Sequence, residues 1–289
     1  MTISSKFRIS IVTPSLNQGA FLEEALLSVK EQSYAPFEHI VMDGGSTDGS
    51  VEILKRCSSQ PGWEHLHWVS EPDGGQSDAL NKGFKIATGD FVGWLNTDER
   101  YRSGCFETIA NSVARYPEVD VFYGDSTFMN EKGHIWRIRH EIEFNRFILH
   151  YLSMLYILTA ATFFRRRIFQ DGNWIDTKYD YAMDYEFMLR LDDRGYRFQH
   201  IPELLADFRI HPQSKSISHP ERSRAEHNLI GVMYSPVLRR MGGTLSTKVV
   251  LNGLRFIARG LRCSEKLLRG YYLEQLSPSM SRIIRSRTR

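Results

Sequence analysis

The feature that most constrains the fold is a regular alternation of short apolar runs with helical segments over roughly the first 124 residues. The predicted strands occupy residues 8–13, 39–43, 66–69, 91–95 and 119–123. The predicted helices occupy residues 21–29, 50–57, 77–87 and 103–116. Short apolar strands that alternate with helices are typical of a mainly parallel sheet with helices on both faces, so the chain is predicted to have an α/β fold.

Polar loops follow the first four predicted strands, at residues 13–19, 43–49, 70–76 and 96–100. All four are rich in Asp, Asn, Ser, Thr and Gly. In open α/β sheets, ligands bind beyond the carboxyl ends of the strands. The sequence therefore predicts that one edge of the sheet carries most of the chemistry.

The alternation fades after residue 124. Residues 126–145 predict a hairpin, residues 178–194 a helix and residues 204–210 a strand. From about residue 220 the pattern is helical and basic, with a break at residues 241–243. We therefore expect two parts, an α/β domain over residues 1–218 and a helical, basic C-terminal extension over residues 219–289.

Composition excludes some classes of protein. Hydrophobic residues make up 42% of the chain and charged residues 25%, as in folded globular proteins. A net charge of +3 gives no reason to expect a nucleic-acid partner. The basic excess gathers at the end of the chain, in Arg282, Arg285, Arg287 and Arg289. Such a tail is either a solvated helix end or a segment that favours an anionic membrane surface or an acidic substrate.

The cysteines and the start of the chain indicate the compartment. The three cysteines are odd in number and far apart, which predicts a reducing environment without disulfides or a zinc site. Residues 1–8 are polar and lead directly into an apolar run, so we expect no signal peptide. Together these features predict a cytoplasmic protein.

Residues 147–164 form an uncharged, mostly apolar stretch that is just long enough to span a membrane. Polar residues dilute it, and a span here would place Asp98 and Asp184 on opposite sides of the membrane. We therefore expect a buried or groove-lining segment, with a membrane span as the alternative.

The loop that begins at Asp43 contains a run of glycines and good helix-capping residues. Its glycines permit a ligand to approach the backbone closely, and Asp43 is placed to accept hydrogen bonds from a base or a ribose. The alternative, that Ser46, Thr47 and Asp48 simply cap the next helix, is the more frequent role of such a loop.

Three further segments contain residues with the chemistry of a site. Asp98 and Glu99 follow a strand, and their oxygens suit Mg²⁺ or Mn²⁺, although such a pair is more often a turn. Asp184 lies among apolar residues of a predicted helix, where burial would raise its pKa and make it a general base. The alternative is that Asp184 lies on a solvated face of the helix and pairs with Arg190 or Arg194. His211 suits contact with a metal or a phosphate, although a lone histidine is more often structural.

Read in order, these segments resemble the family-2 glycosyltransferases of GT-A fold. The blocks are IVTP (11–14) with Asn17, IVMDGGSTD (40–48), SEPDGGQSDALNKG (70–83), ATGDFVGWLNTD (87–98), TFFRR (162–166), YAMDYE (181–186) and FRIH (208–211). The likeness spans residues 8–218, and residues 219–289 carry none of it.

The resemblance implies transfer of a sugar, with inversion, from a nucleotide-sugar, expected to be a UDP-sugar, to a hydroxyl of a glycan or lipid-linked glycan in cell-surface polysaccharide synthesis. Asp184 matches the catalytic base, Asp98 the last acid of the D-x-D metal motif, and His211 a later residue that reaches the metal, Mn²⁺ or Mg²⁺. The residues expected to bind the nucleotide-sugar are Thr13, Pro14, Asn17, Asp43, Ser46, Asp73, Gln76, Asp78, Lys82, Asn96 and Thr97. The basic C-terminus is expected to allow peripheral contact with the inner face of the cell membrane.

The chain departs from the family pattern at three positions. Asn96 replaces the first acid of the D-x-D motif, Met183 replaces the acid before the base, and Leu80 replaces an arginine. The first two changes remove acids expected near the metal and the base. They leave open a non-catalytic protein that binds sugar nucleotides or glycans. A sugar nucleotidyltransferase is a weaker alternative, because the N-terminal part has no basic, glycine-rich phosphate loop.

Overall fold

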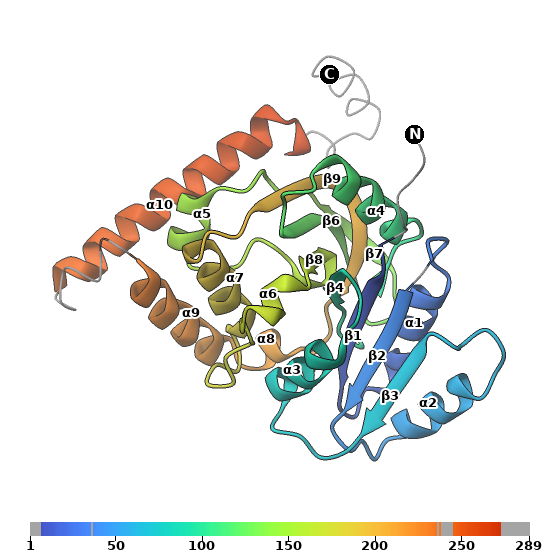
Figure 1. Ribbon diagram of the computed structural model, residues 1–289. Coiled ribbons are helices and arrows are strands. Elements are labelled where there is room, and N and C mark those ends of the chain that lie inside the picture. Colours follow the sequence, from blue (N-terminus) through green and yellow to red (C-terminus); the bar gives the residue numbers. More distant parts are fainter. Residues whose placement is uncertain (1–6, 36, 236, 238–244, 273–289) are drawn as a thin grey trace.

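The computed structural model describes residues 7–35, 37–235, 237 and 245–272 (Figure 1). Its central feature is a nine-stranded sheet. The first four long strands are β1 (Ile9–Ser15), β2 (Phe37–Asp43), β3 (Leu66–Ser70) and β4 (Phe91–Trp94). They pair in parallel in the order β3-β2-β1-β4. The predicted parallel sheet is therefore confirmed for this half of the molecule.

Helices cover both faces of these strands. One face carries α1 (Gly19–Lys30), α2 (Ser50–Ser58) and α4 (Cys105–Arg115), and the other carries α3 (Gln76–Ile86). Successive side chains of a strand point to opposite faces. Accordingly, Ile11 of β1 packs in a buried cluster with Ala25 and Phe106, whereas Val12 packs in another with Leu80 and Phe84. The alternation seen in the sequence thus produces two cores, one on each side of the sheet.

The remaining strands make the sheet mixed. They are β5 (Arg100–Tyr101), β6 (Val121–Met129), β7 (Ile135–Arg139), β8 (Thr162–Arg165) and β9 (Phe198–Arg209). Strand β8 lies antiparallel between β4 and β6, and β9 runs parallel to β6. The predicted hairpin is present as the antiparallel pair β6–β7. The sequence did not predict β5 or β8, and it placed the start of β9 too late.

The apolar stretch at residues 147–164 is not one helix. It contains most of α5 (Arg146–Tyr151), a loop, the 3-10 turn η1 (Thr159–Ala161) and the start of β8. Ile148, Leu149 and Ile157 are buried in the core shared with α3. None of the helices in the described part of the chain is both long and apolar enough to cross a membrane.

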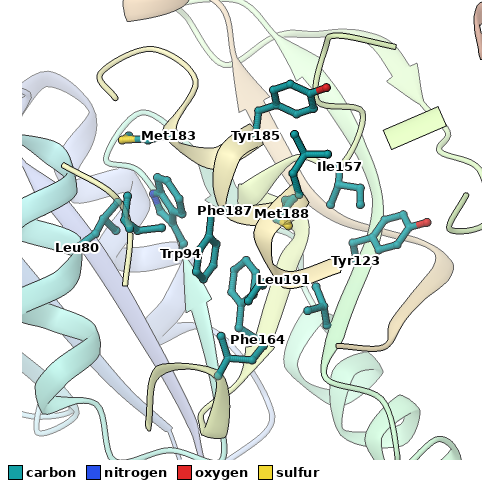
Figure 2. Packing of buried hydrophobic residues seen from close by; sticks show 14 of the residues in the cluster. Leu80, Trp94, Tyr123, Ile157, Phe164, Met183, Tyr185, Phe187, Met188 and Leu191 are labelled. Atoms are coloured by element: carbon teal, nitrogen blue, oxygen red, sulfur yellow. The ribbon is translucent and has the colours of Figure 1, made fainter. Parts of the chain in front are cut away.

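The later helices are α6 (Arg167–Gln170), α7 (Met183–Asp193), α8 (Lys215–Ser218), α9 (Pro220–Tyr234) and α10 (Leu245–Leu268). Helix α7 begins five residues later than predicted. Its apolar side packs on the sheet: Figure 2 shows Phe187 and Leu191 beside Trp94 and Phe164, with the rings of Phe164 and Phe187 5.4 Å apart. Because α7 is fixed in this way, its first turn is held near the carboxyl end of β4.

The region after residue 218 packs on the same body. Ile230 of α9 is buried in the cluster that contains α7, and α10 lies along the outer surface against α5 (Figure 1). The predicted break at residues 241–243 and the arginines of residues 282–289 lie outside the described residues.

Candidate active site

A cavity of about 660 Å³ opens at the edge of the sheet where the parallel strands end. Its walls come from the loops after β1 and β4, the first turns of α3 and α7, the segment that holds Met154, Leu155, Leu158 and Thr159, and α9. The residues predicted for binding or catalysis that line it are Pro14, Asp73, Gln76, Asn96, Asp98, Glu99 and Asp184. The structure therefore brings residues from four separate sequence blocks into one space.

Asp98 and His211 are paired beside this cavity. Asp98 Oδ2 lies 3.0 Å from His211 Nε2, and His211 Nδ1 lies 3.0 Å from Gln213 Oε1. The hydrogen bond to Asp98 raises the pKa of His211. The guanidinium of Arg209 donates to the carbonyl of Asp98 at 3.0 Å, which holds the turn in place.

This pair offers one oxygen and one nitrogen ligand to a divalent cation. Within the described residues, no third His, Cys, Asp or Glu completes a metal-binding cluster around Asp98 and His211. Mg²⁺ and Mn²⁺ often bind through one or two protein side chains and complete their shell with substrate phosphates and water. Asp98 and His211 therefore fit a cation of that kind, bound together with a diphosphate.

Glu99 does not act as a free carboxylate in this arrangement. Its side chain is almost fully buried and accepts a hydrogen bond from the backbone N–H of Asn96 at 2.9 Å. Burial, and then the charges of Asp98 and Asp184, raise its pKa to about 8. The neutral form of Glu99 is thus favoured more than in a free glutamate, and its hydrogen bond to Asn96 stabilises the turn that presents Asp98.

Asp184 lies in the first turn of α7 and lines the cavity. Its carboxylate is half-buried, enclosed by protein on most sides and open toward the cavity. Burial raises its pKa, while His227, the N–H of Tyr185 and Lys215 act in the opposite direction. A carboxylate in such surroundings has the properties of a general base.

Helix α9 supports this turn from outside the sequence blocks that suggested the site residues, which end at residue 211. The carboxylate of Glu226 accepts the backbone N–H groups of Asp180, Tyr181 and Ala182 at 2.7–3.2 Å, so it caps the start of α7. His227 lines the cavity and stacks on the ring of Tyr185. No motif marked Glu226 or His227 in the sequence, because their role depends on where α9 packs.

The residues predicted to meet the nucleoside form a closed network of their own. Asp43 is 2% exposed and accepts hydrogen bonds from the N–H of Ser46 at 2.9 Å, its hydroxyl at 2.5 Å, and the hydroxyl of Ser70 at 2.7 Å. Burial alone would raise the pKa of Asp43, but these hydrogen bonds outweigh it and lower the pKa. Asn17, in a left-handed conformation, accepts the N–H of Thr47 at 2.8 Å.

Other predicted donor-binding residues also bond within the protein. Thr13 is buried and its hydroxyl lies 2.9 Å from His39 Nε2, facing the core. Thr97 is buried and bonds to Gln18, which lines the cavity. Asp78 accepts the N–H of Gly74 and pairs with Lys82 at 3.2 Å, at the start of α3. These side chains shape the loops around the cavity, whereas Gln76 and Asp73 line it directly.

Asn96 and Met183, which stand where the family pattern has acids, both contact the first turn of α3. Asn96 Oδ1 accepts hydrogen bonds from Trp94 Nε1 and Gln76 Nε2, each at 2.9 Å. The Trp94 nitrogen can only donate, so the amide oxygen of Asn96 is the acceptor of both hydrogen bonds and its NH₂ group is left to donate. The hydroxyl of Ser77 lies 2.8 Å from the sulfur of Met183.

Comparison with known proteins places this geometry in a family. The model of Glycosyl transferase family 2 matches residues 10–172, and that of Glycosyl transferase family group 2 matches residues 92–264. An uncharacterized glycosyltransferase of Mycobacterium tuberculosis strain CDC 1551 is 32% identical over 187 residues, covering 63% of this chain and 68% of the relative. A PGL/p-HBAD biosynthesis glycosyltransferase of Mycobacterium bovis strain BCG is 29% identical over 185 residues, with the same coverage.

Solved structures show the same fold. TarS of S. aureus in complex with UDP-GlcNAc has a TM-score of 0.63 at 17% identity, covering 78% of this chain and 66% of that one. The mannosyltransferase PcManGT from Pyrobaculum calidifontis, in complex with GDP-Man and Mn²⁺, has a TM-score of 0.61 at 18% identity, covering 97% and 85%. These likenesses establish a GT-A-like fold, and the family model covers more than half of the sequence, so the chain belongs to glycosyl transferase family 2.

Proposed function

We propose that the protein transfers a sugar from a nucleotide-sugar, a UDP-sugar, onto an acceptor hydroxyl with inversion at the anomeric carbon. The observation that carries this proposal is the meeting of Asp184 and the Asp98–His211 pair at one cavity. One group has the properties of a base and the other fits a cation bound to phosphate. In an inverting single displacement, a base acts on the side of the attacking hydroxyl and positive charge stabilises the leaving group on the other side of the reacting carbon.

On the donor side, Asp98 and His211 would hold Mg²⁺ or Mn²⁺, which supplies positive charge against the departing nucleoside diphosphate. Pro14, Asp73, Gln76 and the amide group of Asn96 line the space available to the nucleotide and the sugar. The network around Asp43 fixes the loops beside them, so that little reorganisation is needed when the donor binds.

On the acceptor side, Asp184 takes the proton of the attacking hydroxyl. Its raised pKa, caused by burial, makes it a stronger base than an exposed aspartate. A base in such a position contributes about 10²–10⁴-fold to the rate. Met154, Leu155, Leu158, Tyr181 and His227 line the same cavity as Asp184 and would contact the acceptor.

The relatives support this choice of substrates. TarS binds UDP-GlcNAc, PcManGT binds GDP-Man with Mn²⁺, and the Mycobacterium bovis relative is named for PGL/p-HBAD biosynthesis. For this chain we propose a glycan or lipid-linked glycan acceptor, in cell-surface glycan synthesis at the cytoplasmic side of the membrane. The basic C-terminus would favour peripheral contact with that surface.

The test is a thermal-shift panel of UDP-, GDP-, dTDP- and CMP-sugars with and without Mn²⁺. A donor at about 100 times its Kd should stabilise the protein by about 2.7 kcal/mol. We expect stabilisation by a UDP-sugar that depends on Mn²⁺. Stabilisation by none of the four classes would contradict the proposal.

A second assay separates the enzyme from a non-catalytic binding protein, the alternative that Asn96 and Met183 favour. Donor hydrolysis and transfer are followed by release of free nucleoside diphosphate. An enzyme releases it in a Mn²⁺-dependent manner, whereas a binding protein shows the thermal shift without any release.

A further inference from the structure

The outward side of helix α10 is apolar, while Arg255, Arg262 and Lys266 bond to the body of the protein. Val249, Phe256, Ile257, Leu261, Leu267 and Leu268 are all exposed, with Phe256 at 80% and Leu268 at 81% of their full accessible surface. At helical spacing these six residues share one side of the helix, which we call the outer face of α10. No charged residue lies within this stripe. Soluble proteins place the apolar side of a surface helix against the core. Helix α10 does so only in part: Leu251 and Ala258 are buried and Leu254 packs on the core, while the six residues of the outer face stay exposed.

The charged residues of α10 explain why the helix lies in this orientation. Arg262 pairs with the buried carboxylate of Glu141 at 2.9 Å, and Arg255 donates to the hydroxyl of Ser153 at 2.8 Å. The carboxylate of Glu265 accepts the backbone N–H of Glu143 at 3.0 Å. The helix is thus attached to the body by these polar contacts together with the buried side chains of Leu251 and Ala258. Its outer face is left without a partner among the described residues.

An exposed apolar stripe of this length marks a surface that binds something. Helix α10 carries Lys248, Arg255, Arg259, Arg262 and Lys266 against a single acid, Glu265. Arg259 is exposed next to the outer face. Apolar side chains flanked by basic ones are typical of helices that lie in the plane of a membrane and bind anionic lipids.

A second copy of the chain fits this surface less well. In a twofold-symmetric pair each residue near the axis meets its own copy. Arg259 lies at the edge of the outer face, about midway along the helix. A symmetric antiparallel pair of α10 helices would therefore bring two arginines close together. Neither helix has an exposed acid to neutralise them, since Glu265 is paired with Arg269 at 3.0 Å. An anionic lipid surface complements the same charges.

We therefore propose that the outer face of α10 docks the protein onto an anionic lipid bilayer, with the helix parallel to the membrane surface. The helix is also tied to the cavity. Glu141 bonds both Arg262 of α10 and Arg139, which lines the cavity, and Ser153 precedes the cavity residue Met154. Docking would thus place the acceptor side of the cavity close to the lipid surface. Only this last point rests on the proposed function.

The test measures co-sedimentation of the full chain with vesicles of phosphatidylcholine containing about 30% phosphatidylglycerol, in the absence of any sugar donor. We expect binding that weakens at high salt and falls with phosphatidylcholine alone. Phe256 and Leu268 would enter the acyl region of the bilayer in the wild type. The double variant Phe256→Glu and Leu268→Glu should therefore reduce the partition coefficient by about tenfold or more. The matched control is Ile86→Glu, an equally drastic change at a 53% exposed residue of α3, which should bind like wild type.

Three results would overturn the proposal. The first is equal vesicle binding by the wild type and the double variant. The second is loss of binding on truncation after residue 272 while the double variant still binds, which would assign docking to the tail. The third is a wild-type dimer that the double variant converts to a monomer, without vesicle binding by either. Because no donor is present, each of these leaves the sugar-transfer proposal to its own assay.

Discussion

The loop after β2 and the acids at the cavity use the same residue type in opposite ways. The oxygens of Asp43 accept hydrogen bonds from its own loop and from Ser70, so its carboxylate stabilises the conformation of that loop. Asp184 accepts only the N–H of the next residue among its described contacts, and it opens onto the cavity. An aspartate at a strand or helix end therefore has a structural role when all its hydrogen bonds are made within the protein. It is a candidate for chemistry when they are not.

The comparison is tested most severely at Asp184. Asp184→Asn removes the base while keeping the shape of the side chain, so transfer should fall by about 10²–10⁴-fold. Donor affinity should stay within about twofold of wild type, because the side chain does not hold the cation. Both are measured with the same UDP-sugar, by product release and by titration. Transfer at the wild-type rate would remove Asp184 from the mechanism.

The pH dependence of transfer also tests the role of Asp184 as a base. A base acts only when deprotonated, so activity should fall as the pH drops through the pKa of Asp184. Burial raises that pKa, so the acid limb should lie above the value of about 3.9 of a free aspartate. The measurement is kcat against pH at saturating donor. An acid limb at or below about pH 3.9 would contradict the assignment.

At Asp98 the expected loss is in binding. Asp98→Ala removes an oxygen ligand, so the affinity for UDP in the presence of Mn²⁺ should fall by about tenfold or more. The affinity without Mn²⁺ should change little. Glu107→Ala, which removes an exposed acid on α4, is the control and should behave like wild type. Unchanged Mn²⁺-dependent affinity in Asp98→Ala would refute the ligand role.

At Asp43 the expected loss is in stability. Asp43→Asn turns an NH₂ group toward hydrogen-bond donors, which should lower the free energy of unfolding by about 2 kcal/mol. The pKa of Asp43 is lowered in the folded protein. Its contribution is therefore present above about pH 3.9, the unfolded value, and is lost as the pH falls through the folded pKa.

Urea unfolding at pH 7 and at acid pH checks this prediction. The difference between wild type and Asp43→Asn should shrink on acidification. A variant as stable as wild type at pH 7, with weakened donor binding, would instead make Asp43 a direct nucleotide contact.

The smallest effect is expected at Asn96. A carboxylate there can still accept from Trp94 and Gln76, and its second oxygen replaces the NH₂ group. Asn96→Asp should therefore bind Mn²⁺ more tightly by about 1 kcal/mol, or roughly fivefold, a gain limited by repulsion from Asp98. Calorimetric titration with Mn²⁺ in the presence of UDP measures it. Weaker Mn²⁺ binding than in wild type would show that the acid is excluded from this position.

The fold was predictable where the pattern is local. The β1–β4 strands and the helices between them follow from apolar spacing, because each repeats the same unit. Strand β8 was hidden inside an apolar stretch, since its place between β4 and β6 depends on pairing with strands distant in sequence. Helix α7 begins at Met183 because Glu226, from α9, accepts the N–H groups that precede it, and no local signal predicts that contact.

The site was predictable only in part for the same reason. The order of the blocks proposed Asp98, Asp184 and His211, and the structure places Asp98 and Asp184 at one cavity, with His211 bonded to Asp98. The sequence did not indicate that Ser46 bonds to both Asp43 and Asn17, nor that His227 lines the cavity. Those facts depend on how hydrogen bonds are shared between loops, which a linear pattern does not record.

The cap that Glu226 provides has a consequence for dividing the gene into expressible pieces. A fragment ending at residue 218 would keep every block of the family resemblance, yet its three N–H groups before α7 would lose their acceptor. Such a fragment would retain most of the sheet, while the turn that carries Asp184 would exchange its amide hydrogens rapidly. The shortest segment that preserves an ordered turn at Asp184 must therefore extend through α9.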